Sequence, residues 1–84
     1  MAEVFVTDEV YKQLTELPRV IRPRIARIFK RLEQWPDVSG AKALTRNLAG
    51  RFRMRTGDYR VQFFIDGERV IVEKVGHRDG FYGE

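Results

Sequence analysis

The sequence predicts an α+β domain in which a short N-terminal strand and a two-helix hairpin precede a three-stranded antiparallel sheet, with both helices packed on one sheet face. Apolar residues recur every three or four positions in the first half of the chain, as in helices, and mostly every second position in the second half, as in strands. The second half also contains Gly57-Asp58 and Asp66-Gly67, pairs that favour tight hairpin turns. The 84 residues suffice for one modest core, so residues 1–84 are expected to form a single domain.

The N-terminal strand and the first helix follow from the first residues of the chain. Residues 2–6 alternate weakly and contain two valines and one phenylalanine, which predicts a short strand. Thr7 then has the side chain of a helix N-cap, and the two acidic residues after it complement the helix dipole. The apolar positions that follow predict a short helix that ends before Pro18.

A second helix, stopped by Pro36, is expected next. It begins at about Arg19, or at Pro23 if that proline lies in the first turn, and runs to about Trp35. The face opposite its apolar stripe is basic and carries Arg22, Arg24, Arg27, Lys30 and Arg31. That face is either a solvated helix surface or a contact with a nucleic-acid backbone. A polar loop over residues 37–47 then leads to the sheet.

Residues 48–65 predict a hairpin with one cationic and one apolar face, because side chains two apart in a strand point to the same side. With Gly57-Asp58 as a two-residue turn, Thr56 pairs with Tyr59. The same register places the following residues opposite one another: Met54 and Val61, Phe52 and Phe63, Arg55 and Arg60, and Arg53 and Gln62. A register shifted by one residue would mix the two faces.

A third strand over residues 69–75 is expected to follow a turn at Asp66-Gly67. The resulting register pairs Phe63 with Val70, Val61 with Val72, and Arg60 with Glu73, the last as a salt bridge.

The alternation beyond that strand decides which side chains share the polar face. His77 is expected there, whereas Arg78 joins it only if the strand ends or bends near Gly76. The predicted cationic surface consists of Arg51, Arg53, Arg55, Arg60 and Arg69, with Glu73 and His77. Three apolar residues on it are expected to be covered by the C-terminal tail or to line a groove for a partner, namely Phe64, Ile71 and Val75.

The composition excludes several kinds of site. The chain has no cysteine, which rules out disulfides, a thiolate nucleophile and a cysteine-based zinc site. A single histidine makes a transition-metal site improbable, and no cofactor is expected. No signal-peptide pattern or apolar run of roughly 20 residues occurs, so a cytoplasmic protein without a membrane segment is expected. The net charge of +4, with arginine outnumbering lysine, favours a polyanionic partner, either nucleic acid or an acidic protein.

Four short motifs follow one another in the second half of the chain. They are Leu48-Ala49-Gly50, the Arg-Phe-Arg-Met-Arg of residues 51–55, the Gly-Asp-Tyr-Arg-Val of residues 57–61, and the Val-Gly-His-Arg of residues 75–78 with Tyr82 close behind. Together with the element order and the length, they resemble the RelE/ParE superfamily of bacterial toxins over nearly the whole chain. The resemblance implies the RelE-like fold and a toxin neutralised by a cognate antitoxin, with which it can form a hetero-oligomer.

Two activities are compatible with this resemblance. The RelE branch implies a metal-independent endoribonuclease that cuts mRNA in the ribosomal A site and so inhibits translation. The ParE branch shares the fold but poisons DNA gyrase without cutting RNA. This alternative is favoured by Asn47, which stands where some relatives of the RelE branch carry a glutamate general base. It is disfavoured by the histidine, arginine and tyrosine gathered at the C-terminal tail, so the nuclease activity is the one we expect.

The resemblance to the RelE branch also implies site residues. The basic residues of its active-site strand match Arg51, Arg53 and Arg55, and its later functional residues match Arg60, His77, Arg78 and Tyr82. RNA cleavage through the 2′-hydroxyl needs a base, an acid and cations that stabilise the pentavalent phosphate. The phosphate clamps are expected to be Arg53, Arg60 and Arg78, the proton-transfer groups His77 and Tyr82, and the RNA-backbone ligands Lys42, Arg46, Arg51 and Arg55.

Overall fold

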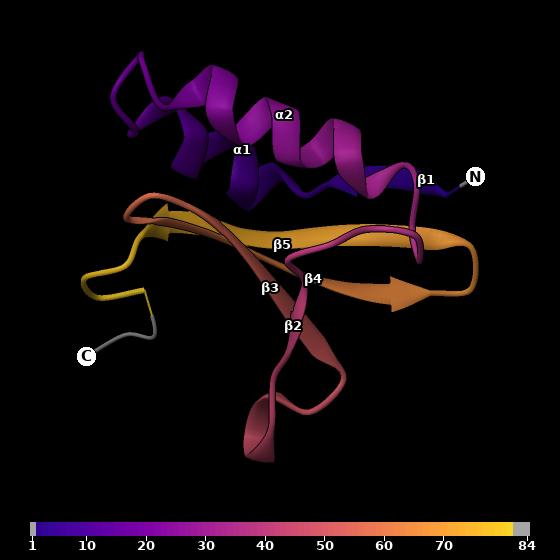
Figure 1. Cartoon of the computed structure of the whole chain (residues 1–84). Coiled ribbons are helices and arrows are strands. Elements are labelled where there is room, and N and C mark those ends of the chain that lie inside the picture. Colours follow the sequence, from indigo (N-terminus) through magenta and orange to yellow (C-terminus); the bar gives the residue numbers. More distant parts are fainter. Residues whose placement is uncertain (1, 82–84) are drawn as a thin grey trace.

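Two helices cover one face of a five-stranded sheet in the computed structural model, which describes residues 2–81 (Figure 1). The elements in chain order are β1 (Glu3–Val6), α1 (Asp8–Thr15), α2 (Arg22–Leu32), β2 (Lys42–Ala43), the 3-10 helix η1 (Arg46–Leu48), β3 (Arg51–Thr56), β4 (Tyr59–Asp66) and β5 (Arg69–His77). The strand order is β1-β5-β4-β3-β2, with β1 parallel to β5 and the other pairs antiparallel. The expected α+β architecture is confirmed, but β1 and a short β2 extend the sheet at its two edges.

Local signals set the helix boundaries. The Thr7 hydroxyl accepts a hydrogen bond from a backbone N–H of the first turn at 3.2 Å and caps α1, as expected. Pro23 lies in the first turn of α2, where its missing N–H costs no helical hydrogen bond. α2 ends at Leu32 rather than near Trp35, because the last turn tightens: the N–H groups of residues 33–35 bond the carbonyls three positions earlier, up to the residue before Pro36. Neither α1 nor α2 is long and apolar enough to cross a membrane, and the rest of residues 2–81 adds no such helix.

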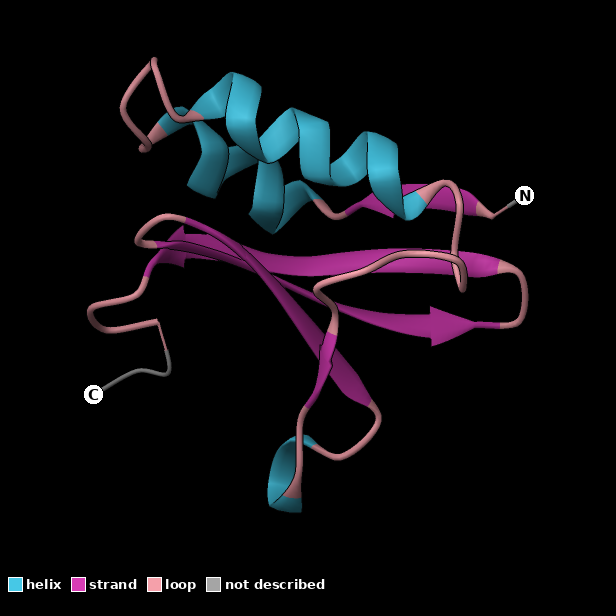
Figure 2. Ribbon diagram, viewed as in Figure 1, coloured by secondary structure: helices cyan, strands magenta, loops and turns pink. Residues whose placement is uncertain are grey.

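The core lies between the two helices and the sheet (Figure 2). Its largest fully buried side chains come from both layers and are Phe63, Ile25, Leu32, Met54, Val10, Val61, Val70 and Val72. Phe63 meets Trp35 edge-on, with 5.4 Å between ring centroids, and stacks on Phe52 at 5.6 Å. Alternate residues of β3 and β4 therefore face the helices, and the residues between them face the opposite side of the sheet.

The β3–β4 hairpin has the predicted register. Its pairs are Phe52 with Phe63, Arg53 with Gln62, Met54 with Val61, Arg55 with Arg60, and Thr56 with Tyr59. Gly57 has a φ of +59°, a backbone geometry that favours glycine in a two-residue turn. The turn chemistry and the apolar alternation specify the same register, which explains why the sequence was sufficient here.

The β4–β5 hairpin differs from the prediction. Asp66 pairs with Arg69, so residues 67–68 form the turn, which lies closer to the C-terminus than the predicted pair. Phe63 consequently lies opposite Val72 instead of Val70.

A β-bulge in β5 then changes the faces of its last residues. The neighbours of Glu73 on either side pair with the adjacent β4 residues Gln62 and Phe63, which leaves Glu73 as the extra residue. This insertion reverses the alternation. Val75 is therefore buried in the core, with 3% of its surface exposed, and does not lie on the polar face as predicted.

The bulge also corrects the expected surroundings of two site residues. Arg60 lies opposite Gly76 rather than Glu73. His77 lies opposite Tyr59, which packs against the core, and so His77 is on the helix side of the sheet rather than on the polar face. The alternation in the sequence could not reveal the bulge, because two consecutive polar residues occupy it.

Replacing Gly57 and Gly67 separately by alanine should distinguish a backbone effect from a packing effect. Both glycines have positive φ, +59° and +63°, so each alanine should cost about 1–2 kcal/mol of stability. A Cβ at Gly67 has nothing within 4 Å, whereas one at Gly57 would lie 2.9 Å from Arg24 Nη2. Displacing that guanidinium disturbs its Nε hydrogen bond to Thr56 Oγ1 (3.0 Å), and Gly57→Ala should cost about 1 kcal/mol more.

Urea unfolding followed by circular dichroism measures this difference between the two glycine variants. In an Arg24→Ala background, Gly57→Ala and Gly67→Ala should destabilise the chain equally. An equal cost in the unmodified background would contradict a packing contact between Arg24 and the β3–β4 turn.

Candidate functional site

Basic side chains gather on the sheet face that the helices leave uncovered. Residues directly opposite in neighbouring antiparallel strands point to the same side, so cross-strand pairing aligns side chains in rows. One row crosses the sheet from β2 to β5 through Lys42, Arg53, Gln62 and Lys74. Arg55 and Arg60 form an opposed pair beside it. The surface made by Lys42, Arg53, Arg55, Arg60 and Lys74 is named the cationic face.

A cavity of about 270 Å³ opens at the β2–β3 edge of the cationic face. It is lined by Gly40, Lys42, Arg53 and Arg55. Guanidinium groups bind phosphate oxygens through paired N–H donors, so a cavity with this lining suits an anion. Three residues predicted to contact RNA thus come together here. Within residues 2–81, no group of three or more His, Cys, Asp or Glu side chains is placed to hold a metal ion.

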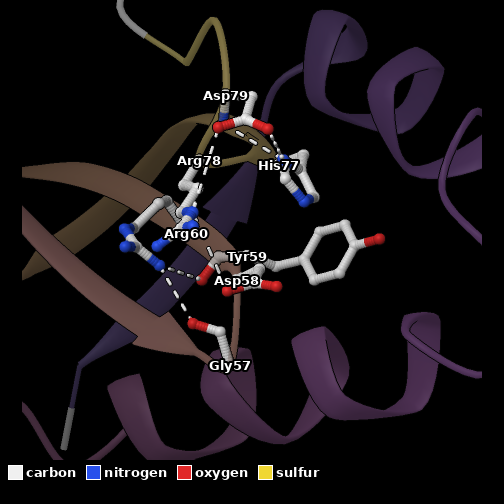
Figure 3. A network of polar contacts seen from close by, with 7 residues as sticks. All are labelled: Gly57, Asp58, Tyr59, Arg60, His77, Arg78 and Asp79. Carbon is white, nitrogen blue, oxygen red and sulfur yellow. Dashed lines mark hydrogen bonds and ion pairs between the residues drawn. The ribbon is translucent and has the colours of Figure 1, made fainter.

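Arg60 and Arg78 both reach the β3–β4 turn (Figure 3). Arg60 Nη1 donates to the backbone carbonyls of Gly57 at 3.1 Å and Tyr59 at 3.4 Å. The Arg78 N–H donates to the Asp58 carbonyl at 2.7 Å, and Arg78 Nε lies 3.8 Å from Asp58 Oδ1. β5 ends immediately before Arg78, which meets the condition for Arg78 to approach the cationic face.

His77 lies at the end of β5, beside this turn. Its ring meets Tyr59 edge-on, with 5.1 Å between ring centroids (Figure 3). Nδ1 accepts a hydrogen bond from the Asp79 N–H at 3.1 Å and lies 3.6 Å from Asp79 Oδ2. Because Nδ1 accepts, the neutral ring carries its proton on Nε2. Tyr82, the other predicted proton-transfer residue, lies outside the described residues.

Arg51 belongs to a polar network on the same side of the sheet. Its guanidinium donates to Glu73 Oε2 at 3.0 Å and Oε1 at 3.5 Å, and lies 5.0 Å from the ring centroid of Phe64. Gln62, with 6% of its surface exposed, donates from Nε2 to Glu73 Oε2 at 2.8 Å. Glu73 therefore pairs with Arg51 and not with Arg60. No sequence pattern marked Gln62, because its contact depends on the bulge.

The chain after β5 folds back over part of the uncovered sheet face. Lys74 Nζ lies 4.6 Å from the ring centroid of Phe81, which is 3% exposed. A Cβ added at Gly76 would lie 3.5 Å from the same ring. The tail thus covers the end of β5, whereas Phe64 and Ile71 remain partly exposed.

Other basic residues named by the sequence lie apart from the cationic face. Arg46 begins η1, has a φ of +59° and is exposed in a segment that projects away from the helices (Figure 2). On α2, Arg22 donates to backbone carbonyls at the end of α1, Arg24 to Thr56, and Arg31 to Ser39. These hydrogen bonds give much of the basic helix surface a structural role within the chain.

Known toxins are similar to this chain in both sequence and fold. No protein-family model matches the chain. It is 37% identical over 67 residues to toxin RelG of Mycobacterium tuberculosis, a match covering 77% of this chain and 76% of RelG. It is 28% identical over 83 residues to toxin RelE3 of Methanocaldococcus jannaschii, covering 95% and 94% of the two chains.

The structural comparison agrees with the sequence comparison. A chain of the toxin–antitoxin complex RelBE2 from Mycobacterium tuberculosis superposes with a TM-score of 0.79 and 29% sequence identity, over 92% of this chain and 98% of the other. The fold and the identity to RelG over more than three quarters of both proteins lead to one conclusion. The chain belongs to the RelE family of toxins from toxin–antitoxin systems.

Proposed function

We propose that this chain is a toxin that cuts mRNA on the ribosome without a metal ion and thereby inhibits translation. The observation that carries the proposal is the meeting of Arg60 and Arg78 at one turn beside the cationic face. Cleavage through the 2′-hydroxyl adds negative charge to the pentavalent phosphate, and guanidinium groups held in place stabilise that charge. Arg53, Arg60 and Arg78 are assigned to the phosphate that is cut.

Further cations are assigned to the RNA backbone. Lys42 and Arg55 line the cavity together with Arg53, and each can neutralise a neighbouring phosphate. Arg46, which lies apart from the cationic face at the start of η1, is assigned to a more distant stretch of the RNA backbone. Arg51 is assigned a weaker contact with the backbone, because its guanidinium is paired with Glu73.

Proton transfer to the departing 5′-oxygen is assigned to His77. As an imidazolium ion the ring would have Nδ1 facing Asp79 Oδ2 at 3.6 Å and would donate its other proton from Nε2, which leaves a neutral ring. The ring lies at the strand end next to Arg78, on the border between the helix side and the turn. Tyr82 is proposed as a second donor or as a platform on which a base stacks.

An antitoxin is proposed as the second partner. The similar Mycobacterium tuberculosis chain was solved in a toxin–antitoxin complex, RelBE2. An acidic antitoxin segment would complement the cationic face, and a segment bound there would exclude RNA. The toxin and its antitoxin would then form a hetero-oligomer, and ribosomes with mRNA would be the target once the antitoxin is lost.

Expression in a bacterium, with mRNA 5′ ends mapped, should show new cuts in a translated transcript and none in an untranslated copy of the same transcript. The untranslated copy, which lacks only its start codon and ribosome-binding site, is the control for other nucleases. Growth arrest with intact mRNA and induced DNA damage would contradict the proposal and indicate gyrase inhibition. Intact mRNA without arrest would also contradict it.

Arg60→Ala and Arg78→Ala should each relieve growth arrest, because removing one contact to the charge of the transition state costs about 10²–10³ in rate. Colony counts after induction, with immunoblots that confirm equal protein levels, measure the effect. Lys12→Ala is the control, since it removes one positive charge from an exposed position of α1 on the helix layer. Full toxicity of both arginine variants would reject their assignment to the phosphate.

A further inference from the structure

Glu73 places a carboxylate beside the arginines assigned to RNA. As the extra residue of the bulge it has no residue opposite it in β4. Its side chain lies on the face turned away from the helices, because it contacts Arg51 and Gln62, which both point there. The location is unexpected for a purely cationic phosphate site, since a carboxylate repels phosphate.

Hydrogen bonds hold the Glu73 carboxylate in one orientation, but one of its oxygens can still accept a further hydrogen bond. Oε2 accepts from Arg51 Nε at 3.0 Å and from Gln62 Nε2 at 2.8 Å. Oε1 has a single long contact among the described residues, to Arg51 Nη2 at 3.5 Å. A carboxylate oxygen offers two lone pairs, so Oε1 can accept a further hydrogen bond. The Glu73 side chain is 21% exposed, which gives a ligand access to it.

Gln62 connects this carboxylate with the phosphate site. It is the partner of Arg53 across the β3–β4 ladder and donates to Glu73 from the other side. Adjacent strands lie about 5 Å apart. Arg53 on β3 and Glu73 on β5 have β4 between them, so their backbones lie roughly 10 Å apart. Because both long side chains lie on the same face, a nucleotide whose 3′-phosphate binds Arg53 can direct its neighbouring 2′-hydroxyl toward Glu73.

The other candidate bases fit this position less well. Asn47 has no basic side-chain group, and arginine stays protonated. His77, at the end of β5 beside the β3–β4 turn, is assigned to the departing 5′-oxygen and so is not the base for the attacking 2′-hydroxyl. Of these groups, Glu73 alone has a side chain that can accept a proton and that lies on the same face of the sheet as Arg53.

Building on the proposed nuclease function, we propose that Glu73 is the general base that takes the proton of the attacking 2′-hydroxyl. The O2′–H bond breaks as the proton passes to Glu73 Oε1, and the freed electron pair on O2′ forms a bond to phosphorus. The bond from phosphorus to O5′ breaks, and O5′ leaves with that electron pair and accepts a proton from Nε2 of the His77 imidazolium, which becomes neutral. The products are a 2′,3′-cyclic phosphate and a 5′-hydroxyl.

Glu73→Gln tests the proposal with little change of shape. The amide oxygen can replace Oε2 and retain the hydrogen bonds from Arg51 and Gln62, so the variant should fold. Single-turnover cleavage on programmed ribosomes should slow by about 10²–10⁴-fold at saturating toxin, the usual contribution of a general base. Affinity for the ribosome complex should stay equal or rise, because one negative charge is removed near RNA.

Two controls separate catalysis from structure. Glu68→Gln changes the same charge in the exposed β4–β5 turn and should cut at the unmodified rate. Glu73→Asp, which retains an acid on a shorter side chain, should recover part of the rate.

The outcomes distinguish a failure of the Glu73 proposal from a failure of the nuclease proposal on which it rests. Cleavage by Glu73→Gln at close to the unmodified rate, or a loss explained entirely by weaker binding or lower thermal stability, would overturn the role of Glu73 and leave the nuclease proposal intact. Failure of the unmodified chain to cut translated mRNA would overturn both.

Discussion

The extra residue in β5 determines which side chains reach each face of the sheet. Without the bulge at Glu73, strict alternation after Val72 would turn Val75 away from the helices and leave a gap in the core. With it, Val70, Val72 and Val75 are all buried, and the strand ends where Arg78 bonds the β3–β4 turn. A single distortion of one ladder thus completes the core, while the carboxylate of Glu73 remains on the opposite face.

The β3–β4 turn connects the helix layer with the cationic face. Arg24 approaches the turn from α2 through Thr56, whereas Arg60 and Arg78 approach it from the sheet. Arg55 lies directly opposite Arg60, and like charges in that relation destabilise a sheet by up to about 1 kcal/mol. The turn carbonyls that accept from Arg60 offset part of this repulsion. A bound anion would relieve more of it and would therefore stabilise the folded chain.

The sequence was sufficient where independent local signals agreed. At Gly57 the turn chemistry and the apolar alternation specified one register, and the structure has it. At the second turn, Asp66-Gly67 favours a two-residue hairpin turn, but the chain turns at residues 67–68 instead. The bulge at Glu73 then shifts the pairing of β4 and β5 a second time. The sequence did not predict that two edge strands extend the sheet. β1 pairs with β5, which is far away in the sequence, and β2 has only two residues. Neither fact leaves a local pattern.

The site shows the same limit at the level of single side chains. Motif resemblance selects arginines by position, but what a guanidinium can bind depends on its neighbours. Arg51 occupies a position that resemblance assigns to RNA, yet its donors hold Glu73 and its plane lies near Phe64. Arg53, two residues later on the same strand face, instead lines a cavity with Lys42. The number of arginines in the motif therefore overstates how many can bind phosphate, because Arg51 also has to compensate the charge of Glu73 on this face.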